Sequence, residues 1–505
     1  MPILLILLVT AACLEVPWPA PPLGLTAGGA VALSFAVTAV PVLLAAALAR
    51  WVAVTLARDP GRRPEVLRSY VRGRRWLSFG LIAVAVAVLA GCGWGWAVWH
   101  TLAVSHDDAV LLVPGAEALV PLPYVLMLLG VWAAYHRAET ALHRTAPAEV
   151  AARPFWSLPG YVLFHARQLA LLVLFPVALF ATQQGLARWF PATVRSVGYQ
   201  LAAATGGVLL FIFLPRLVKP LLGLKRLPPG PARDRLEATA RRVDCRLTDL
   251  LVWPTRGAVA NALVIGVTPW ARYVILTDRL LDNLRADELD AVFGHEAGHV
   301  NRGHIGYYAG FFVLSAAVAT AAVIGAEQLA AHWGWPPSTD GRPGWQAAPP
   351  VLLLCVYVFV VFGLVSRRCE RQADLYGARA GSCGDPWCGG HTAVTVLPVG
   401  DRNVCRTGSL ALVQALGRVS ALNGGDGPGV PAGLWARAWA RLRAWQHGPV
   451  ADRVEFLLRL AEDPALGDRY DREVAHFRWA VLGLLLAALV ALGTAVGWGE
   501  LWARM

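Results

Sequence analysis

The stretch Ala291-Val-Phe-Gly-His-Glu-Ala-Gly-His-Val300, AVFGHEAGHV, contains two histidines four residues apart, with a glutamate directly after the first. A helix places His295 and His299 on one face with their Cβ atoms about 6 Å apart, which suits two nitrogen ligands of one zinc ion. Glu296 projects to the side, where it can act as a general base on water. Zinc lowers the pKa of bound water toward about 7 and makes hydroxide available for attack on a carbonyl. The alternative is a pair of core histidines that are satisfied by backbone groups.

A catalytic zinc site needs a third protein ligand and an open fourth position. His304 follows His299 by five residues, which places it about 140° away around the helix, so we interpret it as a boundary histidine. The better candidate is Glu370 in Cys369-Glu-Arg-Gln-Ala-Asp374, where two carboxylates share a helical face. One carboxylate can bind zinc, and the other can accept the free N–H of a ligating histidine. The alternative is a solvated acidic face beside neighbouring arginines.

The composition is that of a membrane protein. Of the 505 residues, 56% are hydrophobic and 15% are charged, whereas soluble globular proteins carry about 25% charged residues. Together with a short N-terminal membrane segment, MPILLILLVTAAC, the long apolar runs predict roughly nine spans. That segment lacks the basic leading region that is typical of a cleaved signal peptide. The other spans are expected at about 29–55, 77–103, 110–135, 158–182, 197–217, 305–328, 349–366 and 477–498.

The net charge of +12 does not indicate a nucleic-acid partner. The basic residues lie in short loops beside the apolar runs, as in membrane proteins that keep arginine on the cytoplasmic side, and there is no nucleic-acid-binding motif. Successive loops of a membrane protein lie on opposite sides of the bilayer. If the arginine-rich loops are cytoplasmic, residues 219–304 and 367–476 are cytoplasmic as well. The two polar regions therefore share a compartment, which a joint metal site requires.

The first polar region has a mixed pattern. A juxtamembrane helix is expected at 233–243, and three short β-branched runs at 249–255, 260–267 and 273–278 predict a small sheet. The histidine-bearing helix follows and starts at Ala286 or Asp287. The predicted organisation is a transmembrane region at 1–217 with about six apolar segments, the first half of a catalytic domain at 218–304, two transmembrane helices at 305–366, the second half at 367–476 and a C-terminal transmembrane helix at 477–505.

These motifs carry a resemblance to a known family. HEAGHV, followed two spans later by ERQAD, resembles the integral-membrane zinc endopeptidases that include the CAAX prenyl proteases and the HtpX heat-shock membrane proteases. Asn261-Ala262, with Gly266 downstream, resembles the NAxxxG strand of that family. The resemblance covers about residues 230–310 and 365–460. It implies a mostly α, polytopic α-helical membrane protein with a cytoplasm-facing, zincin-like α+β metallopeptidase domain.

The resemblance also implies a role for each matching residue. His295, His299 and Glu370 would bind zinc. Glu296 would be the general base, and Asp374 would orient a ligating histidine.

A late segment, HGPVADRVEFL, resembles the HPxxxxRIxxL motif of the family, although the proline here follows Gly448 rather than the histidine. The resemblance casts His447 and Arg453 as stabilisers of the oxyanion, because fixed donors pointed at developing charge lower a barrier. The alternative is an ordinary helix start with an exposed arginine. The strand with Asn261 and Ala262 would pair with an extended peptide substrate by β-addition.

A cysteine-bearing insert spans residues 381–407. Cys383, Cys388, His391 and Cys405 could form a closed, structural zinc site. Free thiols and a disulfide are the alternatives, and a reducing cytoplasm disfavours the disulfide.

The sequence therefore predicts a membrane-embedded zinc metalloendopeptidase that acts on membrane or membrane-associated proteins, in quality control or processing. Its cofactor is one catalytic zinc ion, with a second, structural ion if the insert binds one. The expected partners are a polypeptide substrate and the lipid bilayer, in a bacterial inner membrane with the active site on the cytoplasmic side. The alternative is a non-catalytic transporter, scaffold or regulator with a metal-binding module. Glu296 argues against that alternative, because a metal binder needs no base.

Overall fold

A computed structural model describes most of the chain. The described residues are 20–21, 24–106, 109–113, 115–147, 154–171, 175–334, 353, 356–383, 388, 404–423, 433 and 444–504. They fall into two compact units, one of residues up to Ala204 and the other from Thr205 onward. The predicted N-terminal segment, His391 and most of the cysteine insert lie outside the described residues.

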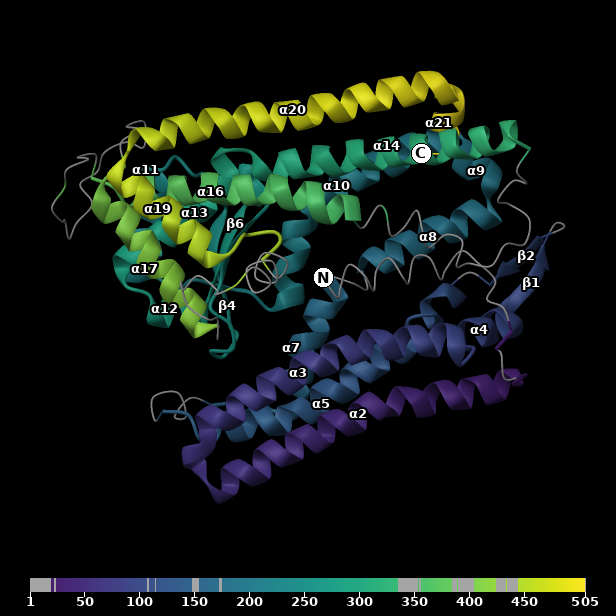
Figure 1. The fold of residues 1–505 in the computed structure, drawn as a ribbon, viewed down its shortest axis with the longest axis horizontal. Helices are drawn as coiled ribbons and strands as arrows, with labels where there is room; N and C mark the ends of the chain where they lie inside the picture. The colour runs from purple at the N-terminus through teal and green to yellow at the C-terminus, as the bar shows by residue number, and fades with distance from the viewer. Residues whose placement is uncertain are drawn as a thin grey trace. The chain divides into compact units, whose positions relative to one another are not determined.

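The first unit is a bundle of long helices in which α2, α3 and α5 lie alongside one another (Figure 1). Ala45, Val52 and Leu56 of α2 are buried in one cluster with Val131 and Tyr135 of α5. Close packing of such side chains is a main source of helix association in a bilayer. The elements are α2 (Ala27–Arg58), η1 (Pro60–Arg62), α3 (Arg63–Val86), η2 (Ala87–Gly91), α4 (Trp94–Leu102), β1 (Ala103–His106), β2 (Ala109–Leu112), η3 (Ala116–Leu119), α5 (Leu122–Arg144), α7 (Leu158–Leu169), α8 (Phe175–Trp189) and α9 (Pro191–Arg195), followed by α10 (Val197–Leu222), which continues into the second unit.

Two apolar runs that we predicted as single spans are interrupted. The run 77–103 forms the end of α3 and the π-helical turn η2, and the chain then turns at Gly93, with φ +81°, before α4. The run 110–135 contains strand β2 and a short 3-10 helix before α5 begins at Leu122, directly after Pro121. Glycine and proline interrupt the helices in these runs, and a prediction based only on the number of consecutive apolar residues misses such interruptions.

Five helices in the described part of the chain are long and apolar enough to cross a membrane. The predicted spans 29–55, 197–217 and 305–328 lie within three of them, and 477–498 lies almost wholly within a fourth. The described part of 349–366, from residue 356, is helical. These helices make the chain an integral membrane protein. Their bounds are Ala27–Arg58, Pro60–Gly91, Val197–Leu222, His304–His332 and Ala465–Val496.

The second unit contains a small mixed sheet with strand order β3-β4-β6-β5. Strands β4 and β6 are parallel, whereas β3 and β5 run antiparallel to their neighbours. The three longer strands match the predicted runs, and β5 forms an edge of the sheet. The elements are β3 (Lys225–Arg226), α11 (Pro231–Arg242), β4 (Asp249–Trp253), β5 (Ala262–Ile265), η5 (Pro269–Ala271), β6 (Tyr273–Thr277), α12 (Asp278–Asn283), α13 (Ala286–Asn301), α14 (His304–His332), η7 (Val358–Phe362), α16 (Gly363–Ala380), α17 (Arg406–Leu422), α19 (Val450–Glu462), α20 (Ala465–Val496) and α21 (Trp498–Arg504).

Helix α13, which carries the histidine motif, lies at the centre of this unit. Phe293 on one side of α13 packs against the sheet, in a cluster with Leu250 and Val274. Ala291 belongs to a second cluster formed by α13, α16, α17 and α19, with Leu412 among its fully buried members. Two hydrophobic cores therefore hold α13 from both sides. Helices α14 and α20 run side by side (Figure 1) and are packed through aromatic and aliphatic side chains.

Glycines allow α13 and α16 to approach closely. A Cβ atom on Gly298 would lie 2.8 Å from Tyr376 Cβ and 3.1 Å from Ala373 Cα, and one on Gly294 would overlap Ala380 Cβ. Larger residues would force the helices apart. Gly294, directly before the histidine motif, and Gly298, within it, therefore bring the carboxylates of α16 within reach of the imidazoles of α13.

Candidate metal centre

The N-terminus of α13 is fixed by a capping interaction. The backbone N–H of Arg285 donates to Glu288 Oε2 at 2.8 Å, so the acidic first turn satisfies a group that the helix leaves unpaired. The helix ends at Asn301, and Gly303, with φ +65°, turns the chain into α14. His295 and His299 therefore lie in the last turns of a helix that is anchored at its start.

Three donor atoms from α13 and α16 converge. His295 Nε2 and His299 Nε2 are 3.3 Å apart. Glu370 Oε1 lies 3.5 Å from His299 Nε2, and Glu370 Oε2 lies 3.7 Å from His295 Nε2. Ligand atoms about 2.0–2.2 Å from a tetrahedral zinc ion are roughly 3.3–3.6 Å from one another. The donor set and its spacing therefore fit a zinc ion, and the sequence-predicted ligands are brought together.

A buried chain of charges orients the first histidine. His295 Nδ1 lies 2.9 Å from Asp374 Oδ1, so its Nε2 points toward Glu370. Arg453 Nε donates to Asp374 Oδ2 at 2.8 Å, and a second guanidinium nitrogen reaches the other carboxylate oxygen. The side chain of Asp374 is fully buried, and that of Arg453 is 11% exposed. Arg453, predicted near the oxyanion, is thus placed against the carboxylates of α16.

A second chain orients the other histidine. His304 Nδ1 lies 3.1 Å from His299 Nδ1, and His304 Nε2 lies 3.0 Å from Gln372 Oε1. Gln372 Nε2 in turn donates to Asp471 Oδ1 at 2.8 Å. If His299 binds metal through Nε2, its Nδ1–H donates to His304, whose Nε2–H donates to Gln372.

Sequence reasoning treated His304 as a boundary residue and did not single out Gln372. His304 is the first residue of α14, as expected of a boundary histidine, but the turn at Gly303 also brings its side chain back to His299. The sequence feature that could have indicated this hydrogen-bond chain is Gln372, because it lies between the two carboxylates of the ERQAD motif.

Glu296 lies between the metal site and the sheet. The backbone N–H of Val264, on edge strand β5, donates to Glu296 Oε2 at 3.0 Å. The neighbouring pair Leu263 and Ile265 faces β6, so the outer edge of β5 is directed toward α13. Asn261 precedes β5, and its carbonyl accepts from Thr277. The proposed base is therefore hydrogen-bonded to the outer edge of β5.

His447 reaches the site from the loop before α19. Its Nδ1 lies 3.0 Å from Glu370 Oε2, while the side chain is 67% exposed. Arg367 of α16 donates to the carbonyl of Trp445 at 3.0 Å, which fastens this loop to the helix that carries Glu370. The loop therefore presents one accessible imidazole beside the predicted metal ligands.

Burial and neighbouring charges perturb the acid–base behaviour of the cluster. Burial lowers the pKa of His299 to about 3, so its imidazole is neutral and has a lone pair for a metal. Burial raises the pKa of Glu296 above its ordinary value. Burial opposes ionisation of Glu370 and Asp374, but hydrogen bonds and charges of neighbouring groups lower the pKa of both. The main such groups are His447 with the two histidines of α13 for Glu370, and Arg453 with His295 for Asp374. The carboxylates of α16 are thus anionic, as cation ligands should be.

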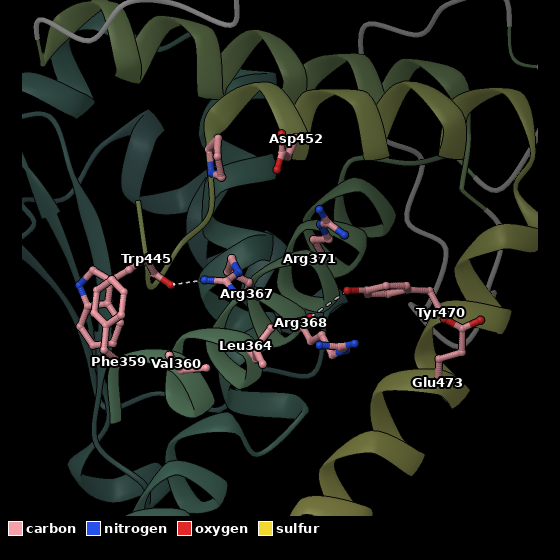
Figure 2. A pocket seen from close by; sticks show the side chains of 11 residues that line it. Phe359, Val360, Leu364, Arg367, Arg368, Arg371, Trp445, Asp452, Tyr470 and Glu473 are labelled. Atoms are coloured by element: carbon pink, nitrogen blue, oxygen red, sulfur yellow. Dashed lines mark hydrogen bonds between the residues drawn. The ribbon is translucent and has the colours of Figure 1, made fainter. Parts of the chain in front are cut away.

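A cavity of about 770 Å³ lies along α16 beside this loop (Figure 2). Its walls combine apolar side chains with arginines, and Figure 2 shows Arg367 directed toward Trp445 and Tyr470 hydrogen-bonded to the backbone of Arg368. None of the three converging donor residues lines this cavity, so it is separate from the candidate metal centre. The lining residues are Phe359, Val360, Leu364, Arg367, Arg368, Arg371, Trp445, Pro449, Asp452, Tyr470 and Glu473.

The fold and site together define an integral membrane protein with an HExxH–ExxxD arrangement whose donor atoms could hold a metal ion. Residues 233–407 match Peptidase family M48. A segment of 101 residues, 19% of this chain, is 33% identical to the Probable CAAX prenyl protease 1 of Schizosaccharomyces pombe and spans 21% of that protein's length. The crystal structure of S. mikatae Ste24p is similar with 15% identity and a TM-score of 0.49, over 83% of this chain and 99% of that chain. The predicted resemblance to membrane peptidases of this type is confirmed.

Proposed function

We propose that this protein is a zinc metalloendopeptidase that hydrolyses peptide bonds in membrane or membrane-associated polypeptides. The observation that carries the proposal is the convergence of His295, His299 and Glu370, with Glu296 hydrogen-bonded to the edge strand β5. Zinc bound by these three residues would supply a Lewis acid and lower the pKa of water. A metal-binding scaffold has no need for a further carboxylate directly after the first histidine ligand.

The roles of the surrounding residues follow from their positions. Glu296 would take a proton from the attacking water and pass it to the leaving amine, since its raised pKa suits both steps. Asn261 and the outer edge of β5, which begins at Ala262, would pair with the backbone of an extended substrate. His447 is an accessible donor that contacts Glu370, and it would stabilise negative charge on the substrate carbonyl oxygen.

Arg453 would act on catalysis mainly through Asp374 rather than by direct contact with substrate. Its guanidinium donates to both oxygens of that carboxylate, which leaves it engaged before any substrate arrives. Asp374 would in turn hold His295 in the orientation that presents Nε2 to the metal.

The site is expected to act on the cytoplasmic side of the membrane. The arginine-rich loops favour a site on the cytoplasmic face of a bacterial inner membrane. The similar Schizosaccharomyces pombe protein is named a CAAX prenyl protease. A prenylated C-terminal peptide is therefore one test substrate, and an unfolded membrane-tethered polypeptide, the substrate of a quality-control protease, is the other.

The test is cleavage by the purified full-length protein in detergent or nanodiscs. We expect wild type to cleave one of these substrates or casein, and Glu296→Gln to lose cleavage while it keeps its zinc. Glu462→Gln, an exposed glutamate of α19, is the control and should retain activity. Equal cleavage by wild type and Glu296→Gln would refute the proposal and favour a non-catalytic scaffold.

A further inference from the structure

A second cluster of metal-binding side chains lies at the junction of α16 and α17. The Sγ atoms of Cys383, Cys388 and Cys405 all lie within 4.8 Å of one another. Sulfur atoms about 2.3 Å from a tetrahedral zinc ion are roughly 3.8 Å apart, so a small contraction would bring all three onto one ion. The spacing of Cys383 and Cys388, with four residues between them, is also within the range used by structural zinc sites.

The position of Cys405 is fixed by the backbone. Its N–H donates to Ser382 Oγ at 3.0 Å, and Ser382 Oγ donates to the carbonyl of Ala378 at 2.7 Å. A Cβ on Gly408 would lie 2.5 Å from that same carbonyl. The first turn of α17 is thus held directly against the last turn of α16, and the third thiol is placed before any metal binds.

Polar groups at the start of α17 contact two of the three sulfur atoms. Cys405 is the N-cap of α17, and its Sγ accepts the N–H of Gly408 at 3.3 Å. Cys388 Sγ lies 3.5 Å from the hydroxyl of Thr407. Both contacts belong to the first turn of α17, a helix of 17 residues, so the sulfur atoms gather at its start.

We propose that Cys383, Cys388 and Cys405 bind a structural zinc ion that is separate from the catalytic one. Three S–H bonds are replaced by three S–Zn bonds, and the three protons are released to solvent. Thiolates and zinc are a well-matched soft ligand set, and no redox change is involved. The ion joins the end of α16, which carries Glu370 and Asp374, to the start of α17.

This ion has a structural consequence for the first site. Helix α17 packs against α13 and α16 through Leu412 and Ala415, in the cluster that also contains Ala291. A cross-link at the start of α17 therefore restrains the shared contact of the two helices that supply the catalytic ligands.

The experiment is a zinc count on the purified full-length protein by mass spectrometry of the metal. We expect two zinc ions per chain in wild type, and one in both Cys383→Ser/Cys388→Ser and His299→Ala. Cys245→Ser, a buried cysteine outside the cluster, should keep two. The same zinc content in wild type and the cysteine double variant would overturn the proposal, whereas an unchanged count in His299→Ala would count only against the catalytic site.

Two measurements on wild type keep the test decisive if a variant does not fold. Cobalt substitution should give a sulfur-to-metal charge-transfer band, and its absence would overturn the site. Zinc loading should protect Cys383 and Cys388 from alkylation, and chelation should expose them. Equal alkylation with and without zinc, or a disulfide between any two of the three cysteines in the purified protein, would also overturn it.

Discussion

Replacement of Arg453 by methionine tests the support beneath the metal centre. The substitution keeps an apolar stem but removes both donors to Asp374, a fully buried carboxylate, from a side chain that is 11% exposed. Removal of one partner from a buried ion pair costs about 3–5 kcal/mol, because the other charge is left uncompensated. For a folding unit of roughly 150–250 residues this cost corresponds to a fall in melting temperature of roughly 6–20 °C.

The same substitution should weaken zinc binding. Without the guanidinium, the pKa of Asp374 rises, because Arg453 is the group that outweighs burial at this carboxyl. Asp374 without its partner is also free to turn and is a weaker acceptor when protonated, so the hydrogen bond that orients the imidazole of His295 is weakened. Loss of a partner behind a metal ligand typically weakens affinity by about 10–100-fold.

The assay compares two variants of one helix. Arg459→Met, also on α19, removes an ion pair with Glu455 in which the side chains are 69% and 60% exposed. Such exposed pairs contribute about 0–1 kcal/mol, so this variant should melt close to wild type and keep its zinc affinity. Competition against a chromogenic chelator measures the affinity. If Arg453→Met melts and binds zinc like Arg459→Met, the proposed chain from Arg453 through Asp374 to His295 is wrong.

Three further substitutions test separate parts of the site. Glu296→Gln should keep zinc but lower kcat for peptide cleavage by about 10²–10⁴-fold, because the general base is lost. Gly294→Ala should destabilise the protein by about 1–3 kcal/mol in a thermal melt, because the new methyl overlaps the last turn of α16. Gly306→Ala, where the added atom meets open space, is its control. Arg367→Met should free the Trp445 loop and lower kcat by on the order of 10- to 100-fold without loss of zinc.

Each of these predictions has a result that contradicts it. Loss of zinc from Glu296→Gln would make that residue a ligand rather than a base. Matching melts for the two glycine variants would mean that α13 and α16 are not in close contact. A kcat for Arg367→Met that equals that of Arg371→Met, a neighbouring residue of the same cavity, would remove the positioning role of the loop contact.

The periodic and motif-bearing parts of the fold were predictable from the sequence. The spacing of His295 and His299 determines their shared face whatever surrounds the helix, and the β-branched runs around Val264 and Val274 alternate with turn residues. The long apolar runs likewise predicted most of the candidate spans. Prolines and glycines interrupt two of these runs, at Gly93 and Pro121. There the apolar composition predicted one span, whereas the backbone forms several shorter elements.

The partners of the site residues were less accessible to sequence reasoning. The contact of His304 with His299 depends on a left-handed glycine between two helices, and that of Arg453 with Asp374 joins residues 79 positions apart. Helical spacing describes one element at a time. It therefore treated His304 as a continuation of the helix that carries His299, and it could not tell which group the side chain of Arg453 contacts. The close approach at Gly294 is likewise a property of two helices together.

The most direct test of the metal centre is an experimental structure of the zinc-loaded protein with anomalous scattering at the zinc edge. The proposed centre predicts a peak about 2.0–2.2 Å from His295 Nε2, His299 Nε2 and a carboxylate oxygen of Glu370. A peak bound by the two histidines with Glu370 turned away, or no peak at this position in active protein, would contradict it.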